Sequence, residues 1–159
     1  MATRSTLADQ QSNDAVVDLG VVDGLVQLSF LIQSLLGRVA ARHGLSIIQL
    51  RLLGVLRDRE IGMLGLSRIL ELEKSSATGL VDRAERRELV RRVPVVGNRR
   101  AVHVALSEQG QALARAVHAE VATEITTLTA DLSAPKRDQL SRLATTLVLG
   151  DAAARSLRL

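Results

Sequence analysis

Apolar residues recur at helical spacing through the first third of the chain. From residue 15 to about residue 42 they fall on every third or fourth position, in a stripe made of Val21, Leu25, Leu28, Ile32, Leu35 and Val39. A second apolar flank is made of Leu19, Val22, Val26, Phe30 and Leu36. One helix with so wide an apolar surface has more to bury than a small core can offer, and a second subunit is the simplest cover. We therefore predict a dimerisation helix within residues 15–44.

Shorter helical patterns separated by breaks follow in the middle of the chain. Gly44 ends the first helix as a C-terminal cap would, and Ser46 opens a second helix that runs to about residue 59. Residues 61–66 are predicted to form a short extended link, and residues 67–72 a short helix. After a break, Ser75 is predicted to cap the next helix. The last two of these three helices are joined by a tight connection.

The apolar period changes from helical to alternating after residue 89. Val102, Val104 and Leu106 alternate with small or polar residues, which is typical of a strand. Residues 89–94 precede them as a second extended segment, and Gly97-Asn98 between the two tolerates the positive φ of a tight turn. We predict a β-hairpin with a basic tip, because Arg99 and Arg100 follow the turn.

Two long helices are predicted to close the chain, the first capped at Ser107-Glu108 and the second beginning near Pro135. A helix pair followed directly by a basic hairpin is the winged form of the helix-turn-helix. The predicted fold is therefore mainly α with a small β-hairpin wing. Its parts are a flexible tail (1–14), a dimerisation helix (15–44), a winged helix-turn-helix DNA-binding domain (45–106) and C-terminal dimerisation helices (107–159).

The positive charge of the chain is concentrated in one stretch. Residues 74–100 hold eight basic and three acidic residues, a net charge of +5, which leaves −1 for the remainder because the total is +4. A cluster of this kind is expected where one face of a protein meets a polyanion. Double-stranded DNA is the partner that this charge and the predicted helix pair favour together.

The helix after residue 74 can be divided into two faces. Ala77, Leu80, Val81 and Ala84 form its apolar stripe, which leaves short hydroxyl side chains and arginines on the other side. We first interpret Asp82 and Arg86, four residues apart, as an intrahelical ion pair. The predicted DNA-binding residues of this helix and the wing are Lys74, Ser75, Ser76, Thr78, Gly79, Arg83, Arg86, Arg99 and Arg100.

Composition argues against several other classes of protein. The chain has no cysteine, which excludes disulfides and thiol redox sensing, and its three histidines fall in no metal-binding or catalytic motif. We expect no enzymatic activity, no metal and no cofactor. The longest uncharged run near the N-terminus, residues 24–37, is shorter than the roughly 20 residues that span a bilayer. We therefore expect a cytoplasmic protein with no membrane partner.

Three segments resemble the MarR family (multiple antibiotic resistance regulators). They read LSIIQLRLLGVL (45–56), LELEKSSATGLVDRAERRELVRR (70–92) and NRRAVHVALSEQG (98–110). The resemblance implies a homodimeric winged helix-turn-helix repressor or activator that small, often aromatic or anionic, ligands release from DNA. It also implies that Ser75, Ser76 and Thr78 contact DNA from the recognition helix, and that Arg99 or Arg100 is the wing arginine.

The chain departs from the family pattern at three places. Gly79 stands where a polar residue is common, Gly97-Asn98 replaces the usual wing aspartate, and Glu88 replaces a helix-ending glycine. An effector pocket in a chain without tyrosine or tryptophan would use aliphatic walls with a few other groups. The candidate ligand-binding residues are Gln27, Phe30, Arg51 and His118.

The function predicted from these features is a homodimeric, sequence-specific transcriptional regulator. It is expected to act as a ligand-responsive repressor at a pseudo-palindromic operator. The alternative is a helical protein–protein interaction module whose basic patch docks an acidic partner. These two hypotheses differ in whether Arg83, Arg99 and Arg100 matter more than other surface arginines.

Overall fold

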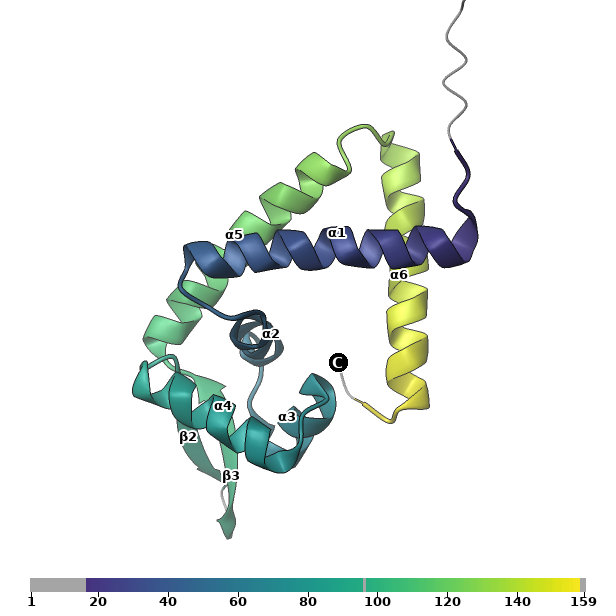
Figure 1. Cartoon of the computed structure of the whole chain (residues 1–159). Coiled ribbons are helices and arrows are strands. Elements are labelled where there is room, and N and C mark those ends of the chain that lie inside the picture. Colours follow the sequence, from purple (N-terminus) through teal and green to yellow (C-terminus); the bar gives the residue numbers. More distant parts are fainter. Residues whose placement is uncertain (1–16, 96, 158–159) are drawn as a thin grey trace, which may run out of the picture. The chain divides into compact units, whose positions relative to one another are not determined.

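The computed structural model describes residues 17–95 and 97–157, so the predicted tail 1–14 lies outside the described residues. The chain divides into two units, Met1–Ile32 and Gln33–Leu159. Helix α1 (Gly20–Arg42) begins in the first unit and continues into the second (Figure 1). It is shorter than predicted at its N-terminal end, because residues 17–19 are not helical.

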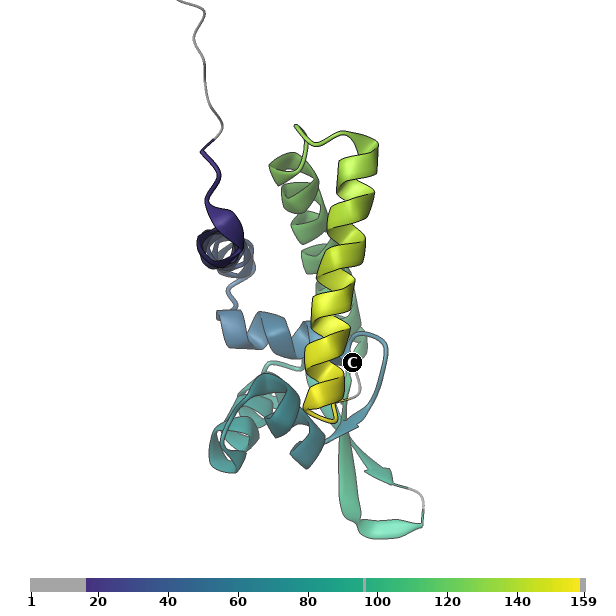
Figure 2. The same ribbon diagram turned by 90° about the vertical axis from the view of Figure 1, so that its right-hand side faces the viewer.

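The second unit contains a winged helix-turn-helix, which confirms the predicted fold class. Its elements are α2 (Ile47–Leu56), β1 (Ile61–Gly62), α3 (Met63–Leu70), α4 (Lys74–Arg86), β2 (Val90–Val95) and β3 (Asn98–Leu106). The strands form an antiparallel sheet in the order β1-β3-β2. In Figure 2 the hairpin of β2 and β3 extends beyond the helices of this domain. Helices α5 (Glu108–Leu128) and α6 (Ala134–Ala154) follow the sheet.

Several helix boundaries follow from local chemistry that the sequence displays. Ser46 caps α2 through its hydroxyl, which accepts from the Gln49 backbone, while the Gln49 side chain accepts from the Ser46 N–H. Gly44 has φ +61°, the left-handed conformation that ends α1 at little steric cost. Ser107 caps α5 by accepting from the Gly110 N–H. These three predictions are confirmed.

The predicted link over residues 61–66 is extended only at its start. Ile61 and Gly62 pair with Val104 and His103 of β3, and α3 begins directly afterwards at Met63. The rest of the segment is helical because Leu66 and Leu70, four residues apart, are both buried in the core. The prediction was wrong because a short apolar run does not distinguish a strand from a helix.

One hydrophobic core joins the end of α1 to the winged helix and to α5. Its most deeply buried large side chains are Val39, Leu52, Leu53, Leu56, Leu66, Leu80, Val81 and Val104. Outside this core, both long terminal helices carry exposed apolar residues. Val21 and Val22 of α1 are 78% and 73% exposed, and Leu143 and Leu147 of α6 are 56% and 59% exposed.

Helix α1 is more apolar than the uncharged run of residues 24–37 suggested. Its 23 residues include an 18-residue window of mean hydropathy 1.4, so by length and composition alone it could cross a bilayer. The core helices of soluble proteins pass the same test. Only 6% of that window is buried, so its apolar surface requires a cover.

Gly110 should be essential for packing the first turn of α5 against the backbone of Leu89, the residue before β2. A Cβ at this position would lie 1.9 Å from the backbone oxygen of Leu89, so one of the two elements would have to move. We expect Gly110→Ala to lower the free energy of unfolding by about 3 kcal/mol. The matched control is Gly54→Ala on α2, where a Cβ meets nothing within 4 Å and helix propensity should stabilise by about 1 kcal/mol. Chemical denaturation measures both, and a neutral Gly110→Ala would contradict the packing described.

Candidate nucleic-acid interface

The rotation of α4 is set by four apolar residues on its inner side. Ala77, Leu80, Val81 and Ala84 are each 1% exposed, as the sequence predicted. Because these positions face the core, the residues between them must face outward. Ser75, Ser76, Thr78, Arg83 and Arg86 are all exposed.

The N-terminus of α4 is open to an anion. The N-cap is Glu73, which makes no side-chain capping bond, so the prediction that Ser75 caps this helix is wrong. The first intrahelical bond runs from the Ala77 N–H to the Glu73 carbonyl. The N–H groups of the three residues before Ala77 precede that bond, and a helix N-terminus of this kind favours a phosphate. Ser75 and Ser76 lie beside these groups within the first turn.

A shallow depression of about 660 Å³ follows the outer side of this first turn. It is lined by Glu73, Lys74, Ser75, Thr78, Gly79 and Asp82. The structure therefore brings four of the predicted contact residues, Lys74, Ser75, Thr78 and Gly79, to one surface. The Thr78 hydroxyl donates to the Lys74 carbonyl at 2.9 Å, which leaves its oxygen and methyl group available to an outside partner.

Gly79 lies beneath the side chain of Arg83. A Cβ at position 79 would lie 3.2 Å from Arg83 Nη1, which is the far end of a flexible side chain. The glycine thus leaves room for the guanidinium along the helix, although its own φ is not in the left-handed region. This contact offers a local reason for a glycine in a helix interior.

The predicted ion pair between Asp82 and Arg86 is not made. Asp82 instead binds Arg92 of β2, with Arg92 Nη2 2.5 Å from Asp82 Oδ1, and Arg92 Nη1 contacts Glu85 Oε2. The hydrogen bond to Asp82 is the main cause that raises the pKa of Arg92. Asp82 and Glu85 lie on the side of α4 that faces the wing, where a cation from another element reaches them.

This arrangement leaves the cations of α4 available. Across the described residues, Lys74, Arg83 and Arg86 form no ion pair. In the wing, Gly97 adopts φ +83° in the turn, and Arg99 and Arg100 follow Asn98, the first residue of β3. The side chains of these two arginines lie outside the described part of the structure. Their backbone position agrees with the predicted basic tip.

The C-terminal end of α4 is tied to two other elements. Arg87 Nη1 donates to the Gly44 carbonyl at 3.0 Å, which connects α4 to the turn between α1 and α2. Glu88 adopts φ +56° and so takes the conformation that a helix-ending glycine would take. The Ser107 hydroxyl donates to the Glu88 carbonyl. The end of the helix is therefore anchored despite the replacement of glycine.

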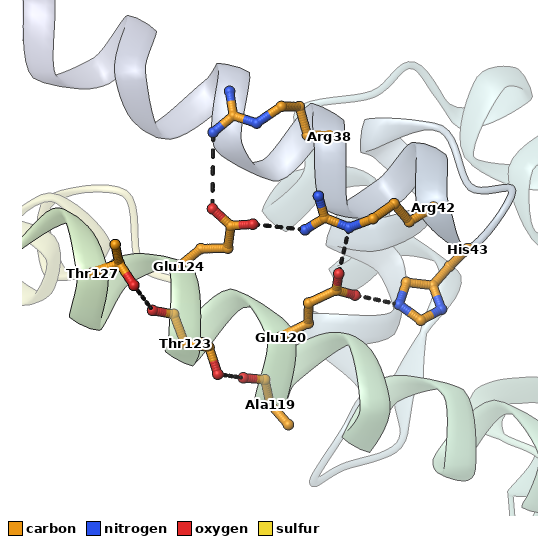
Figure 3. Close-up of polar contacts among 8 residues, drawn as sticks. All are labelled: Arg38, Arg42, His43, Ala119, Glu120, Thr123, Glu124 and Thr127. Atoms are coloured by element: carbon orange, nitrogen blue, oxygen red, sulfur yellow. Dashed lines mark hydrogen bonds and ion pairs between the residues drawn. The ribbon is translucent and has the colours of Figure 1, made fainter.

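An ion-pair cluster joins the end of α1 to α5 (Figure 3). Arg42 Nη2 lies 2.8 Å from Glu124 Oε1, and its Nε contacts Glu120. His43 Nε2 lies 2.6 Å from Glu120 Oε2, and Arg38 reaches Glu124 at 3.9 Å. The bond to Glu124 is the main cause that raises the pKa of Arg42, and the bond from His43 is the main cause that lowers the pKa of Glu120. The cluster favours the charged form of the Glu120 carboxylate.

The candidate ligand-binding residues do not all meet in one place. His118 lines a pocket of about 110 Å³ between α2 and α5 together with Arg57, which the sequence pattern did not indicate. Arg51 lines a different pocket beside the end of α6. Gln27 and Phe30 lie on exposed turns of α1 in the first unit. Arg57 could not be singled out from the sequence, because only the fold brings it to His118.

The α2–α5 pocket has apolar walls and a polar end. Its walls include Leu36, Leu50, Leu53, Val117 and Val121. At the polar end, Arg57 Nη1 donates to His118 Nδ1 at 2.9 Å, which makes Nδ1 the acceptor nitrogen of that ring. Arg57 also pairs with the exposed Asp58 at 3.0 Å. Apolar walls with one cation suit a small anionic molecule.

Comparison with known proteins points to one family. A sequence model described as the MarR family matches residues 43–101. The chain is 32% identical over 97 residues to the HTH-type transcriptional regulator PecS of Dickeya dadantii (strain 3937), a match that covers 58% of each protein. The chain thus spans less than two thirds of the length of this curated relative.

Solved structures agree in fold. Wild-type MarR in its apo form from E. coli has a TM-score of 0.68 and 22% identity, with 83% of this chain and 98% of that chain covered. NadR, solved in complex with 4-hydroxyphenylacetate, has a TM-score of 0.67 and 20% identity, with 92% of this chain and 97% of that chain covered. At these identities the likeness establishes the winged-helix fold.

Gly79→Ala should stabilise the protein, because only the mobile end of Arg83 stands in the way of a Cβ. We expect a gain of about 1 kcal/mol from helix propensity, which corresponds to a rise of roughly 2 to 4 °C in Tm for a chain of this size. Differential scanning calorimetry measures the change. A lower Tm would mean that the space above Gly79 is needed for packing rather than for the arginine.

Proposed function

We propose that the chain, which matches the MarR family model over residues 43–101, is a transcriptional regulator of that family, a cytoplasmic homodimer that represses transcription by binding operator DNA. The observation that carries this proposal is the outer face of α4. It combines a free helix N-terminus, short hydroxyl side chains and three cations that form no ion pair in the described part of the chain. Each of these features suits a duplex.

The residues of this face fall into two roles. Arg83, Arg86 and Lys74 are proposed to bind phosphates, because long cationic side chains position a protein on the DNA backbone. Ser76 and Thr78 are proposed to approach base edges, since short side chains allow the helix to lie deep in the major groove. Arg99 and Arg100 are proposed to reach the backbone or minor groove from the wing.

The dimer is proposed from the exposed apolar surface of the terminal helices. Leu143, Leu147 and Val148 of α6 and Val21 and Val22 of α1 are each more than half exposed. A soluble monomer seldom leaves large apolar patches in water, and each of these two helices carries several exposed apolar side chains. Two-fold symmetry would place two α4 helices on half-sites about 10 to 10.5 bp apart.

Binding of a duplex should weaken steeply as salt rises, because bound phosphates release counterions. Arg83→Gln should reduce the slope of log K against log salt by about 0.9 for each phosphate that the variant no longer neutralises. Fluorescence anisotropy with labelled duplex at several salt concentrations gives this slope. The matched control is Arg115→Gln on the exposed side of α5, which should leave the slope unchanged.

Sequence preference should depend on Thr78 rather than on threonines elsewhere. Thr78→Val keeps the shape but removes the hydroxyl, and we expect it to change discrimination between sites by about 1 kcal/mol. Thr123→Val on α5 makes the same chemical change, since that hydroxyl also bonds its own helix, and should have no effect. If neither arginine nor threonine variants differ from their controls, the interaction-module hypothesis with an acidic protein partner is favoured instead.

A small anionic effector is proposed to bind the α2–α5 pocket. NadR holds 4-hydroxyphenylacetate in its solved complex, and in this chain Arg57 and His118 supply a polar end to an apolar pocket. The pocket has a volume of about 110 Å³, so it would hold only a small ligand unless its walls open. The carboxylate would bind Arg57 in place of His118 or Asp58.

An aromatic carboxylate should therefore weaken operator binding through Arg57. The probe is 4-hydroxyphenylacetate. We expect Arg57→Gln to require at least a tenfold higher probe concentration than the wild type for the same loss of duplex affinity. Arg51→Gln is the control, because that arginine lines a different pocket. Equal responses from both variants would exclude the α2–α5 pocket as the site.

A further inference from the structure

Arg92 forms the one bridge described between the wing strand β2 and the acidic side of α4. Its forked guanidinium binds two carboxylates at once, Asp82 through Nη2 at 2.5 Å and Glu85 through Nη1. The three side chains are 35%, 41% and 39% exposed, so water screens the contact only in part. A planar fork holds two acceptors in a defined geometry, which an ammonium does not.

Across the described residues, Arg92 is the cation that pairs with both Asp82 and Glu85. Asp82 and Glu85 are three residues apart on α4, so their carboxylates are neighbours on one side of the helix and would repel each other. Arg91, the residue before Arg92, pairs instead with Glu60 at 3.6 Å. The pairing of β2 with β3 places Arg92 opposite Val104, which is fully buried. The bridge therefore connects α4 to a strand that is itself fixed in the core.

We propose that Arg92 is a positioning residue for DNA recognition, which holds α4 and the wing at a fixed angle and keeps Asp82 and Glu85 turned away from the phosphates. The proposal rests on the proposed function, in which α4 and the wing contact one duplex. Arg92 itself touches no DNA in this scheme. Its charge is neutralised by the two acids, and the cations of α4 remain free to bind phosphate.

The positioning role and simple charge repulsion predict opposite effects of removing the Asp82 carboxylate. Removing an acid from a DNA-binding surface ordinarily strengthens binding, because it removes repulsion from phosphates. If Asp82 holds Arg92, Asp82→Asn should instead weaken operator binding, by roughly threefold. The double variant Asp82→Asn with Arg92→Gln should bind no worse than Arg92→Gln alone, because both changes break the same contact.

Two substitutions of Arg92 separate positioning from a phosphate contact. Arg92→Gln should raise the operator Kd by roughly fivefold while leaving the salt slope of the wild type unchanged. Arg92→Lys keeps the charge but not the fork, and should still lose roughly threefold in affinity. Arg91→Gln is the matched control on the same strand. Thermal unfolding of each variant establishes that the fold is retained.

The experiment uses the full chain and a labelled duplex that the wild-type protein has selected from random-sequence DNA, in anisotropy titrations at several salt concentrations. Stronger binding by Asp82→Asn, or a salt slope that falls for Arg92→Gln while Arg92→Lys binds like the wild type, would overturn the positioning role. Failure of the proposed function is distinguishable, because then the wild type would show no salt-dependent duplex binding and Arg83→Gln would change nothing. Weaker binding by all three variants at constant slope supports the proposal.

Discussion

The rotation of α4 about its own axis is the constraint on which the proposed interface depends. Four apolar side chains, Ala77, Leu80, Val81 and Ala84, occupy the inner face and leave almost no surface in water. Since interiors are closely packed, turning the helix by one residue would bury an arginine or expose a leucine. The hydroxyl and cationic residues of α4 therefore face outward because the opposite side of the helix is buried.

Polar contacts around α4 then define where that face points. Arg92 binds its acidic side from the wing, and Arg87 binds the Gly44 carbonyl at the turn between α1 and α2. The same turn includes His43, which bonds Glu120 of α5. Helix α4 is thus connected through short links to the sheet, to the turn after α1 and, through that turn, to α5.

The sequence was sufficient for the features that burial alone determines. Hydrophobic period predicted the inner face of α4, and capping chemistry predicted Ser46 and Ser107 at their helix ends. The sequence did not predict side-chain interactions between residues of different helices and strands. Asp82 had an apparent partner four residues away, but Arg92 reaches it only because the strand after α4 folds back along the helix. Arg57 was missed for the same reason, since it meets His118 across two helices.

The central claim, that two symmetric copies of this α4 face read one duplex, is tested most directly by the sites that the protein selects. Fragments of the source genome are incubated with the purified full chain, recovered with it and sequenced. The account predicts an enriched motif with two-fold symmetry and half-sites about 10 to 10.5 bp apart. Recovery of fragments with no common motif, or with a single unsymmetrical site, would contradict it.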